Sequence, residues 1–250
     1  MTEVTRAGDV VFRSRGPGSA QVERFLAFLE REGFEYAPRF LGISPDDRQM
    51  LSYVPGDAGD YPLPENLRGQ ATLRSAAEVL RRLHDVGSGV AESVTGGWML
   101  PDVHPAEVVC HGDFAPYNCV FDGERVTGVI DFDAAHTGPR LWDIAYAVYR
   151  FVPLADPRNP VAFGTLQEQA ERTRVFCDEY GLKDRSGLVD TVCARLHALI
   201  DFMRAEAAAG HAAFSRHLDE GHDLTYLRDI EYLRRNEDTI TSIVTGPGTG

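Results

Sequence analysis

The sequence predicts an α+β protein in which a small lobe of strands and one helix, over residues 1–54, precedes a larger and mainly helical lobe over 55–250. Two observations predict this division. In the first lobe, strand-like runs bounded by turn residues flank a single amphipathic stretch. In the second, apolar residues recur at helical spacing over most of the length. A chain of 250 residues is long enough to form two such lobes.

The first lobe is predicted to contain a strand, a helix and a hairpin, in that order. Residues 8–13 include the strand-like run Asp-Val-Val-Phe-Arg. The helix extends from Ser19, a candidate N-cap, to a stop at the next glycine, with apolar residues along one side. The hairpin joins strands over 38–43 and 49–54 through a Ser-Pro-Asp-Asp-Arg turn. A Pro-Gly pair follows, and we therefore place the lobe boundary near Val54.

The second lobe is predicted from helices and one further hairpin. Apolar stripes indicate helices over 67–86, 165–180 and 188–209 and a helical region over 223–236. Another helix begins after Pro139, because proline suits the first turn of a helix. The hairpin joins the strand Cys-Val-Phe to a return strand over 125–130 through an Asp-Gly turn. These elements make the second lobe mainly helical.

Composition limits the classes of partner. The chain carries 38 acidic and 25 basic residues, a formal net charge of −13, so it has no basic stripe for nucleic acid. The acidity suits a cationic substrate, and it equally suits solubility alone. No apolar run reaches the length of a membrane span, and the first residues lack a signal-peptide core. The four cysteines have neither metal-ligand spacing nor disulfide density, so we expect buried, reduced thiols in a cytoplasmic protein without a membrane partner.

Residues 108–133 carry the groups that suit chemistry. His111, Asp113 and Asn118 lie in one short loop, and Asp131 follows at the far end of the predicted hairpin. The loop and the end of the hairpin can therefore converge on one point. Two oxygen ligands suit Mg²⁺, a hard cation that prefers carboxylate or amide oxygens together with phosphate. The remaining aspartate can then accept a proton from a hydroxyl, which is the division of roles that phosphoryl transfer needs.

The run His-Gly-Asp-Phe-Ala-Pro-Tyr-Asn, followed by Val-Ile-Asp-Phe-Asp, resembles the catalytic segment of the aminoglycoside phosphotransferase family. Members of that family are small-molecule kinases with a protein-kinase-like fold of two lobes. The resemblance implies that Asp113 is the catalytic base and that His111 braces the catalytic loop. It also implies that Asn118 and Asp131 hold Mg²⁺, with ATP as the co-substrate.

The sequence departs from the protein-kinase pattern at two positions of this segment. Gly112 replaces the arginine of the His-Arg-Asp motif, and Asp133 replaces the glycine of Asp-Phe-Gly. Without that arginine we expect no control by a phosphorylated activation loop. Asp133 becomes a candidate for contact with the acceptor substrate. Asp143 matches a family aspartate that braces the catalytic loop, and we expect His84 to have a packing or capping role.

The resemblance also assigns nucleotide contacts in the first lobe. Arg13 would hold the ATP phosphates, and Glu23 stands where the partner of the phosphate-binding cation is expected. Arg15 is a competing choice for that cation. Backbone groups of Ser52, Tyr53 and Val54 would bond the adenine, as the hinge of the family does. Each of these residues could instead be an ordinary surface residue.

The first lobe is expected to be shortened relative to the family. Only about nine residues precede Val11 of the predicted strand, whereas a glycine-rich hairpin over the phosphates would need two strands of roughly five to six residues and a turn. The Gly-Pro-Gly-Ser segment before the first helix could supply backbone amides to a phosphate instead. A plain connection between strand and helix is the simpler interpretation.

Acidic residues of the last helices are candidates for binding the acceptor, as they are in the family. They are Glu206, Asp219, Glu220 and Asp223. Charged faces of helices are usually only solvated, so this assignment competes with an ordinary exposed surface.

The sequence as a whole therefore predicts an ATP-dependent phosphotransferase that moves the γ-phosphoryl group to a hydroxyl of a small polar molecule, with an aminoglycoside as one candidate. The alternative is a non-catalytic kinase-like binding module, a pseudokinase with a degenerate nucleotide site. A metal-dependent phosphohydrolase built from the same carboxylates is a third hypothesis. The sequence does not distinguish ATP from GTP, and it indicates neither the acceptor nor the oligomeric state.

Overall fold

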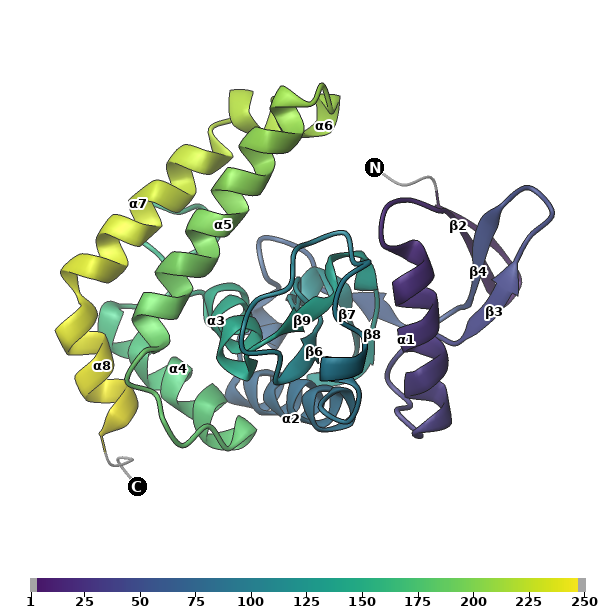
Figure 1. Ribbon diagram of the computed structural model, residues 1–250. Coiled ribbons are helices and arrows are strands. Elements are labelled where there is room, and N and C mark those ends of the chain that lie inside the picture. The colour runs from purple at the N-terminus through teal and green to yellow at the C-terminus, as the bar shows by residue number, and fades with distance from the viewer. Residues whose placement is uncertain (1–3, 247–250) are drawn as a thin grey trace. The chain divides into compact units, whose positions relative to one another are not determined.

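The computed structural model describes residues 4–246 and forms two compact units, Met1–Asp143 and Ile144–Gly250. Helices and antiparallel sheets both occur, which confirms the predicted α+β class (Figure 1). The lobe boundary predicted near Val54 falls inside the first unit and stays a prediction. All catalytic and nucleotide-binding candidates belong to this first unit.

The chain begins with a four-stranded antiparallel sheet and one helix. The sheet has the order β1-β2-β4-β3, and the helix connects β2 to β3. The bounds are β1 Val4–Ala7, β2 Val10–Ser14, α1 Ser19–Arg31, β3 Phe40–Ile43 and β4 Arg48–Ser52. Strand β1 was not predicted, because its four residues are all exposed and show no alternation of buried and exposed side chains. The strand, helix and hairpin that the sequence predicts are otherwise confirmed.

The first helix starts differently from the prediction. Its N-cap is Gly18, in the left-handed conformation with φ of 81°, and Ser19 is the first helical residue. A Cβ on Gly18 would lie 2.4 Å from the backbone nitrogen of Met99. The tight approach of another backbone therefore selects glycine at the cap, and the expected serine cap was wrong.

The rest of the first unit surrounds the catalytic segment. A three-stranded sheet has the order β5-β7-β8, and a two-stranded sheet pairs β6 with β9. The strands are β5 Asp57–Ala58, β6 Val108–Cys110, β7 Cys119–Asp122, β8 Arg125–Val129 and β9 His136–Gly138, and the helix α2 is Gln70–Gly87. Short 3-10 helices are η1 Glu65–Leu67, η2 Ala91–Ser93, η3 Pro116–Asn118 and η4 Phe132–Ala134. The predicted hairpin around Asp122 and the helix over 67–86 are both confirmed.

The regular secondary structure in the described part of the second unit is entirely helical. Helix α3, Arg140–Phe151, begins in the first unit and continues into the second. The others are α4 Leu166–Tyr180, α5 Leu188–Ala208, α6 Ala212–Asp219, α7 His222–Arg235 and α8 Glu237–Thr245. Helices α5 and α7 pack side by side, and α4 packs against α8 (Figure 1). The helices predicted over 165–180 and 188–209 are confirmed, and α7 matches the region predicted over 223–236.

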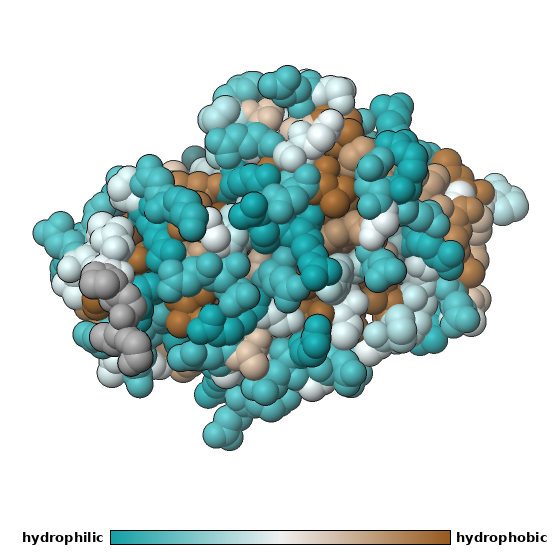
Figure 2. Space-filling model, turned by 90° about the horizontal axis from the view of Figure 1, so that it is seen from below, coloured by the Kyte–Doolittle hydropathy of each residue, from teal (hydrophilic) through white to brown (hydrophobic). Residues whose placement is uncertain are grey.

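Hydrophilic residues cover most of the face shown in Figure 2, and hydrophobic residues form small separate patches on it. No helix in residues 4–246 is both long and apolar enough to span a membrane. The four cysteines are free and buried, as the sequence predicts. Burial raises the pKa of the Cys177 thiol to about 12 and that of Cys193 to about 11.

Candidate active site

The catalytic loop connects β6 to β7 and is fixed by a buried histidine. The Nδ1 atom of His111 accepts a hydrogen bond from the backbone N–H of Asp113 at 3.2 Å. Because Nδ1 accepts, Nε2 carries the proton, and it donates to the backbone oxygen of Ile130 at 3.0 Å. His111 thus ties the loop to the residue directly before Asp131. This geometry supports the bracing role expected for it.

Asp143, in the first turn of α3, holds the start of the same loop. Its Oδ2 atom accepts from the backbone N–H of His111 at 2.7 Å and from Nε2 of His84 at 3.0 Å, and its Oδ1 accepts from Gly112 at 3.0 Å. Burial alone would raise the pKa of Asp143, but these donors outweigh burial and hold that pKa at about 2. Asp143 is therefore a buried, ionised brace, and His84 is its partner.

The structure explains why glycine replaces arginine in the motif. Gly112 has φ of 78°, and a Cβ there would lie 2.1 Å from the backbone oxygen of Ala134. No larger residue fits this left-handed position against η4. The two segments that carry Asp113 and Asp131 can therefore approach closely.

Asp113 and Asn118 face each other across the loop. The amide nitrogen Nδ2 of Asn118 donates to Oδ2 of Asp113 at 2.8 Å and to its backbone oxygen at 3.0 Å. A carboxylate only accepts, so the amide nitrogen must face it, and Oδ1 of Asn118 remains as a ligand. The hydroxyl of Tyr117 donates to Oδ1 of Asp113 at 2.6 Å. Sequence analysis missed Tyr117, although it stands directly before Asn118 in the motif.

Asp131 and Asp133 flank the start of η4 and share one cation. Nη2 of Arg13 donates to Oδ1 of Asp131 at 2.9 Å and to Oδ2 of Asp133 at 2.5 Å. Asp131 adopts the left-handed conformation, with φ of 62°, and 48% of its side chain is exposed. Burial and the charge of Asp131 raise the pKa of Asp133, and Arg13 opposes this rise. Arg13 therefore reaches the predicted metal ligand from β2.

The cation that pairs with Glu23 is Arg15. Its Nε and Nη2 atoms donate to the two carboxylate oxygens of Glu23, at 2.8 and 3.1 Å. Nη1 of Arg15 also donates to Asp47 at 3.1 Å. Arg13 was the first candidate for the cation at Glu23, and the structure replaces it with the competing choice. The reason is that Arg15 lies beyond the end of β2, within reach of α1, whereas Arg13 extends toward η4.

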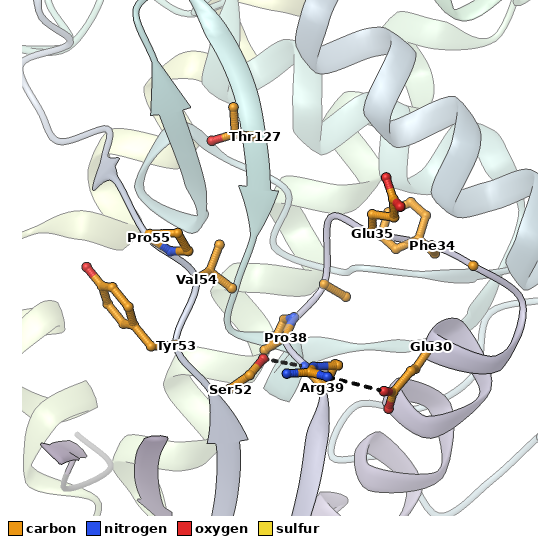
Figure 3. Close-up of a pocket in the computed structure, with 12 residues that line it drawn as sticks. Glu30, Phe34, Glu35, Pro38, Arg39, Ser52, Tyr53, Val54, Pro55 and Thr127 are labelled. Carbon is orange, nitrogen blue, oxygen red and sulfur yellow. Dashed lines mark hydrogen bonds and ion pairs between the residues drawn. The ribbon is translucent and has the colours of Figure 1, made fainter. Parts of the chain in front are cut away.

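The predicted hinge lines a pocket of about 550 Å³. Figure 3 shows Tyr53 and Val54 on one side of it, Phe34 and Glu35 on the other, and the ion pair of Glu30 with Arg39 below. The lining includes none of the catalytic-loop residues. The pocket thus lies on the side of the hinge next to the connection from α1 to β3.

The hinge backbone is partly engaged within the protein. The N–H of Ser52 donates to the backbone oxygen of Arg39 at 2.9 Å, and that of Tyr53 donates to Asp9 at 2.8 Å. Among the described residues, the N–H of Val54 has no such partner. Of the three predicted hinge residues, Val54 is therefore the one with a free backbone donor.

The acidic candidates from the last helices belong to the second unit, whereas Asp133 belongs to the first. Glu206 pairs with His211 at 2.7 Å, Asp223 pairs with Arg204 at 2.7 Å, and Glu220 lies 3.4 Å from His222. Asp219 ends α6. Their contact with an acceptor stays a prediction.

Comparison with known proteins gives three findings. A model of the phosphotransferase enzyme family matches residues 97–177, which include the catalytic loop, the hairpin and Asp131. A trifolitoxin immunity protein of Rhizobium leguminosarum bv. trifolii is 33% identical over 201 residues, which are 76% of this chain and 75% of that protein. The third finding is similarity to solved structures.

Two solved structures illustrate that similarity. One is a choline/ethanolamine kinase family protein from Mesorhizobium loti, with a TM-score of 0.63, 16% identity, and coverage of 98% of this chain and 90% of the other. The second is a candidate aminoglycoside phosphotransferase from Ralstonia eutropha, with a TM-score of 0.60, 14% identity, and coverage of 94% and 92%. At these identities the likeness shows the fold, and it confirms the predicted protein-kinase-like fold.

Proposed function

The chain belongs to the phosphotransferase enzyme family of small-molecule kinases, and from that premise we propose which of its residues carry the transfer of a phosphoryl group from ATP to a hydroxyl. The observation that carries the proposal is the geometry around Asp113. Its carboxylate faces the loop amide of Asn118, and the same loop is tied by His111 to the residue before Asp131. The intact set of Asp113, Asn118 and Asp131 favours catalysis over the non-catalytic alternative.

Asp113 would orient the acceptor hydroxyl and accept its proton. The oxygen of that hydroxyl forms a bond to the γ-phosphorus, the bond from phosphorus to the bridging oxygen of ADP breaks, and the proton passes to Asp113. Carboxylates are weak bases at neutral pH, so proton uptake would come late, after the bond to the leaving group has weakened. Orientation of the hydroxyl is then the larger part of the role.

Asn118 and Asp131 suit Mg²⁺, which would neutralise charge on the nucleotide phosphates when bound. The donor set fits this ion: one amide oxygen faces away from Asp113, and the carboxylate of Asp131 is half exposed. In the described part of the chain, no group of three or more His, Cys, Asp or Glu side chains could hold a metal by itself. Such a site suits an ion that takes one or two protein oxygens and completes its shell with phosphate and water.

Arg13 would bind the nucleotide phosphates, as the cationic residue on the corresponding strand of protein kinases does. It already bonds two carboxylates next to the proposed metal site, so it can exchange one of them for a phosphate oxygen. The pair of Arg15 and Glu23 would then hold α1 against the end of β2 without contacting the nucleotide. The N–H of Val54 is the proposed donor to adenine, and use of ATP is consistent with the predicted cytoplasmic location.

The test is calorimetric titration with ATP, with and without Mg²⁺, together with measurement of ADP release during an acceptor screen. Asp131→Ala should lose the Mg²⁺-dependent part of ATP binding. Asp113→Asn should keep ATP affinity within a few-fold and lower phosphoryl transfer about 10²–10⁴-fold, because it removes the proton acceptor. Asp122→Asn, the same change at an exposed aspartate of the hairpin, is the matched control. Loss of ATP binding in Asp113→Asn would instead indicate that Asp113 is a metal ligand.

A second candidate function concerns the acceptor. The relative at 33% identity is named for immunity to trifolitoxin, and it shares three quarters of its length with this chain. We propose toxin immunity as an alternative to aminoglycoside modification, with the acceptor hydroxyl on the toxin. Expression in a trifolitoxin-sensitive strain, with Asp113→Asn as the control, tests this role. Protection that survives the substitution would separate immunity from phosphoryl transfer.

A further inference from the structure

Tyr117 places a hydroxyl group on the carboxylate that would act as the base. The distance from Tyr117 Oη to Asp113 Oδ1 is 2.6 Å, a normal length for a hydrogen bond from a hydroxyl to a carboxylate. The other oxygen, Oδ2, accepts from Asn118 at 2.8 Å. Both carboxylate oxygens of Asp113 therefore accept a hydrogen bond from another side chain of the protein. An acceptor substrate would present the same chemical group, a hydroxyl, to the same carboxylate.

The backbone of Tyr117 is fixed from two sides. Tyr117 is the middle residue of η3, where the N–H of Asn118 donates to Ala115 at 2.9 Å. The N–H of Gly59 donates to the backbone oxygen of Pro116 at 3.0 Å, and a Cβ on Gly59 would lie 2.9 Å from that oxygen. The segment after β5 therefore packs directly over η3, and the main chain at Tyr117 cannot shift freely.

The side chain of Tyr117 is partly exposed, and its ring lies edge-on to that of Tyr61, with centroids 5.9 Å apart. Since the backbone at Tyr117 is fixed, displacement of the hydroxyl from Asp113 would take place by rotation of this partly exposed side chain.

We propose that the Tyr117 hydroxyl occupies the position on Asp113 that the acceptor hydroxyl takes during transfer, and that it keeps water off this base until an acceptor displaces it. This rests on the proposed role of Asp113. If water takes that position, its oxygen bonds to the γ-phosphorus, the bond to the bridging oxygen of ADP breaks, and a proton passes through Asp113 to solvent. ATP is then hydrolysed to ADP and inorganic phosphate without phosphorylation of an acceptor, and Tyr117 suppresses this loss.

An acceptor can displace Tyr117 where a single water molecule cannot. Exchange of one hydroxyl for another leaves the number of hydrogen bonds at Asp113 unchanged, so the exchange itself is close to neutral. An acceptor gains further contacts elsewhere in the site, whereas water gains none. The displaced tyrosine makes Asp113 selective for acceptors that bind through more than their hydroxyl.

The experiment compares ADP release from Mg²⁺-ATP, without acceptor, in the wild type and in Tyr117→Phe. Phenylalanine keeps the ring and removes only the hydroxyl. We expect ADP release to rise about two- to tenfold, the factor that one hydrogen bond of a hydroxyl represents. Tyr36→Phe is the matched control, because Tyr36 lies in the same unit with its ring against Phe34 and should give the wild-type rate. The double variant Asp113→Asn/Tyr117→Phe should lose the increase.

Each other outcome has a distinct meaning. ADP release that does not rise in Tyr117→Phe, with unchanged ATP affinity by calorimetry, would overturn the proposal and leave the role of Asp113 intact. A phosphate found on Tyr117 by mass spectrometry after incubation of the wild type with ATP would also overturn it, because the tyrosine would then be an acceptor itself. An increase that survives Asp113→Asn would overturn the assignment of Asp113 as base, and this proposal with it.

Discussion

At the scale of single residues, the buried carboxylate of Asp143 is the clearest determinant of the catalytic loop. It accepts two backbone N–H groups and the ring of His84, and all three donors are buried with it. Its pKa of about 2 lies below the ordinary value of 3.8, so the folded state favours the charged form. Stability from this group is therefore fully present above about pH 4 and is lost as the pH falls toward 2.

We predict that Asp143→Asn lowers the free energy of unfolding by about 2 kcal/mol at pH 7, from the size of the pKa shift. The amide keeps the shape but replaces a charged acceptor by a weaker one and adds a donor. Urea unfolding of both proteins at a series of pH values from 7 to 3 measures this effect. The difference between them should shrink below pH 4, and a difference that is constant with pH would contradict an ionised Asp143.

At the scale of elements, two arginines near the end of β2 form ion pairs with two different elements. Arg15 joins β2 to α1 through Glu23, whose side chain is only 9% exposed. Arg13 joins β2 to η4 through Asp131 and Asp133. In protein kinases a single strand lysine both pairs with a glutamate of the helix and contacts the nucleotide phosphates. In this chain the two relations are divided, so the ion pair that anchors α1 does not involve Arg13, the proposed phosphate-binding residue.

A double-mutant cycle can measure the coupling free energy between Arg15 and Glu23. Arg15→Gln and Glu23→Gln should show a coupling free energy in urea unfolding that is larger than that of an exposed i,i+4 pair, because the contact is bidentate. The exposed pair Arg81 and Asp85 is the matched control and should give about 0.3–0.5 kcal/mol. A cycle of Arg13 with Glu23 should give no coupling. Coupling in that last cycle would mean that Arg13 reaches α1 in solution.

At the scale of the whole molecule, both compact units bury their cysteines. Cys110 and Cys119 lie in the first unit, and Cys177 and Cys193 in the second, with no exposed surface on any of them. Burial raises the pKa of Cys119 well above its ordinary value and that of Cys177 to about 12. All four thiols are therefore inaccessible, and the raised pKa keeps Cys119 and Cys177 uncharged at neutral pH.

We predict that the native protein reacts slowly with a coloured disulfide reagent at pH 8 and that all four thiols react once urea unfolds it. The progress of labelling at intermediate urea concentrations would report the opening of the two units. Rapid labelling of one thiol in the native state would contradict its burial. Replacement of Cys177 by serine should remove one equivalent from the total and identify the signal of the second unit.

Local patterns in the sequence were sufficient to predict much of the fold. The helices were predictable because apolar residues recur at helical spacing and glycines end them, and the hairpin of β7 and β8 because an Asp-Gly turn joins two strand-like runs. Strands β1 and β5 were missed, because both are short and fully exposed, so no alternation of side chains marks them. Pairing stabilises them, β1 with the adjacent strand β2 and β5 with the distant strand β7.

The sequence by itself determined the candidate catalytic segment, since the spacing of His111, Asp113, Asn118 and Asp131 within one loop and one hairpin leaves few ways to arrange them. Only the tertiary structure decided which arginine meets which acid. Arg13 and Arg15 have the same parity along the strand, so alternation cannot separate them. The choice depends on where η4 and α1 lie, and the partner of Arg13 stands 118 residues away in the chain. The hydroxyl of Tyr117 reaches Asp113 over only four residues of the same loop, but the sequence pattern does not show how η3 turns that side chain toward the carboxylate.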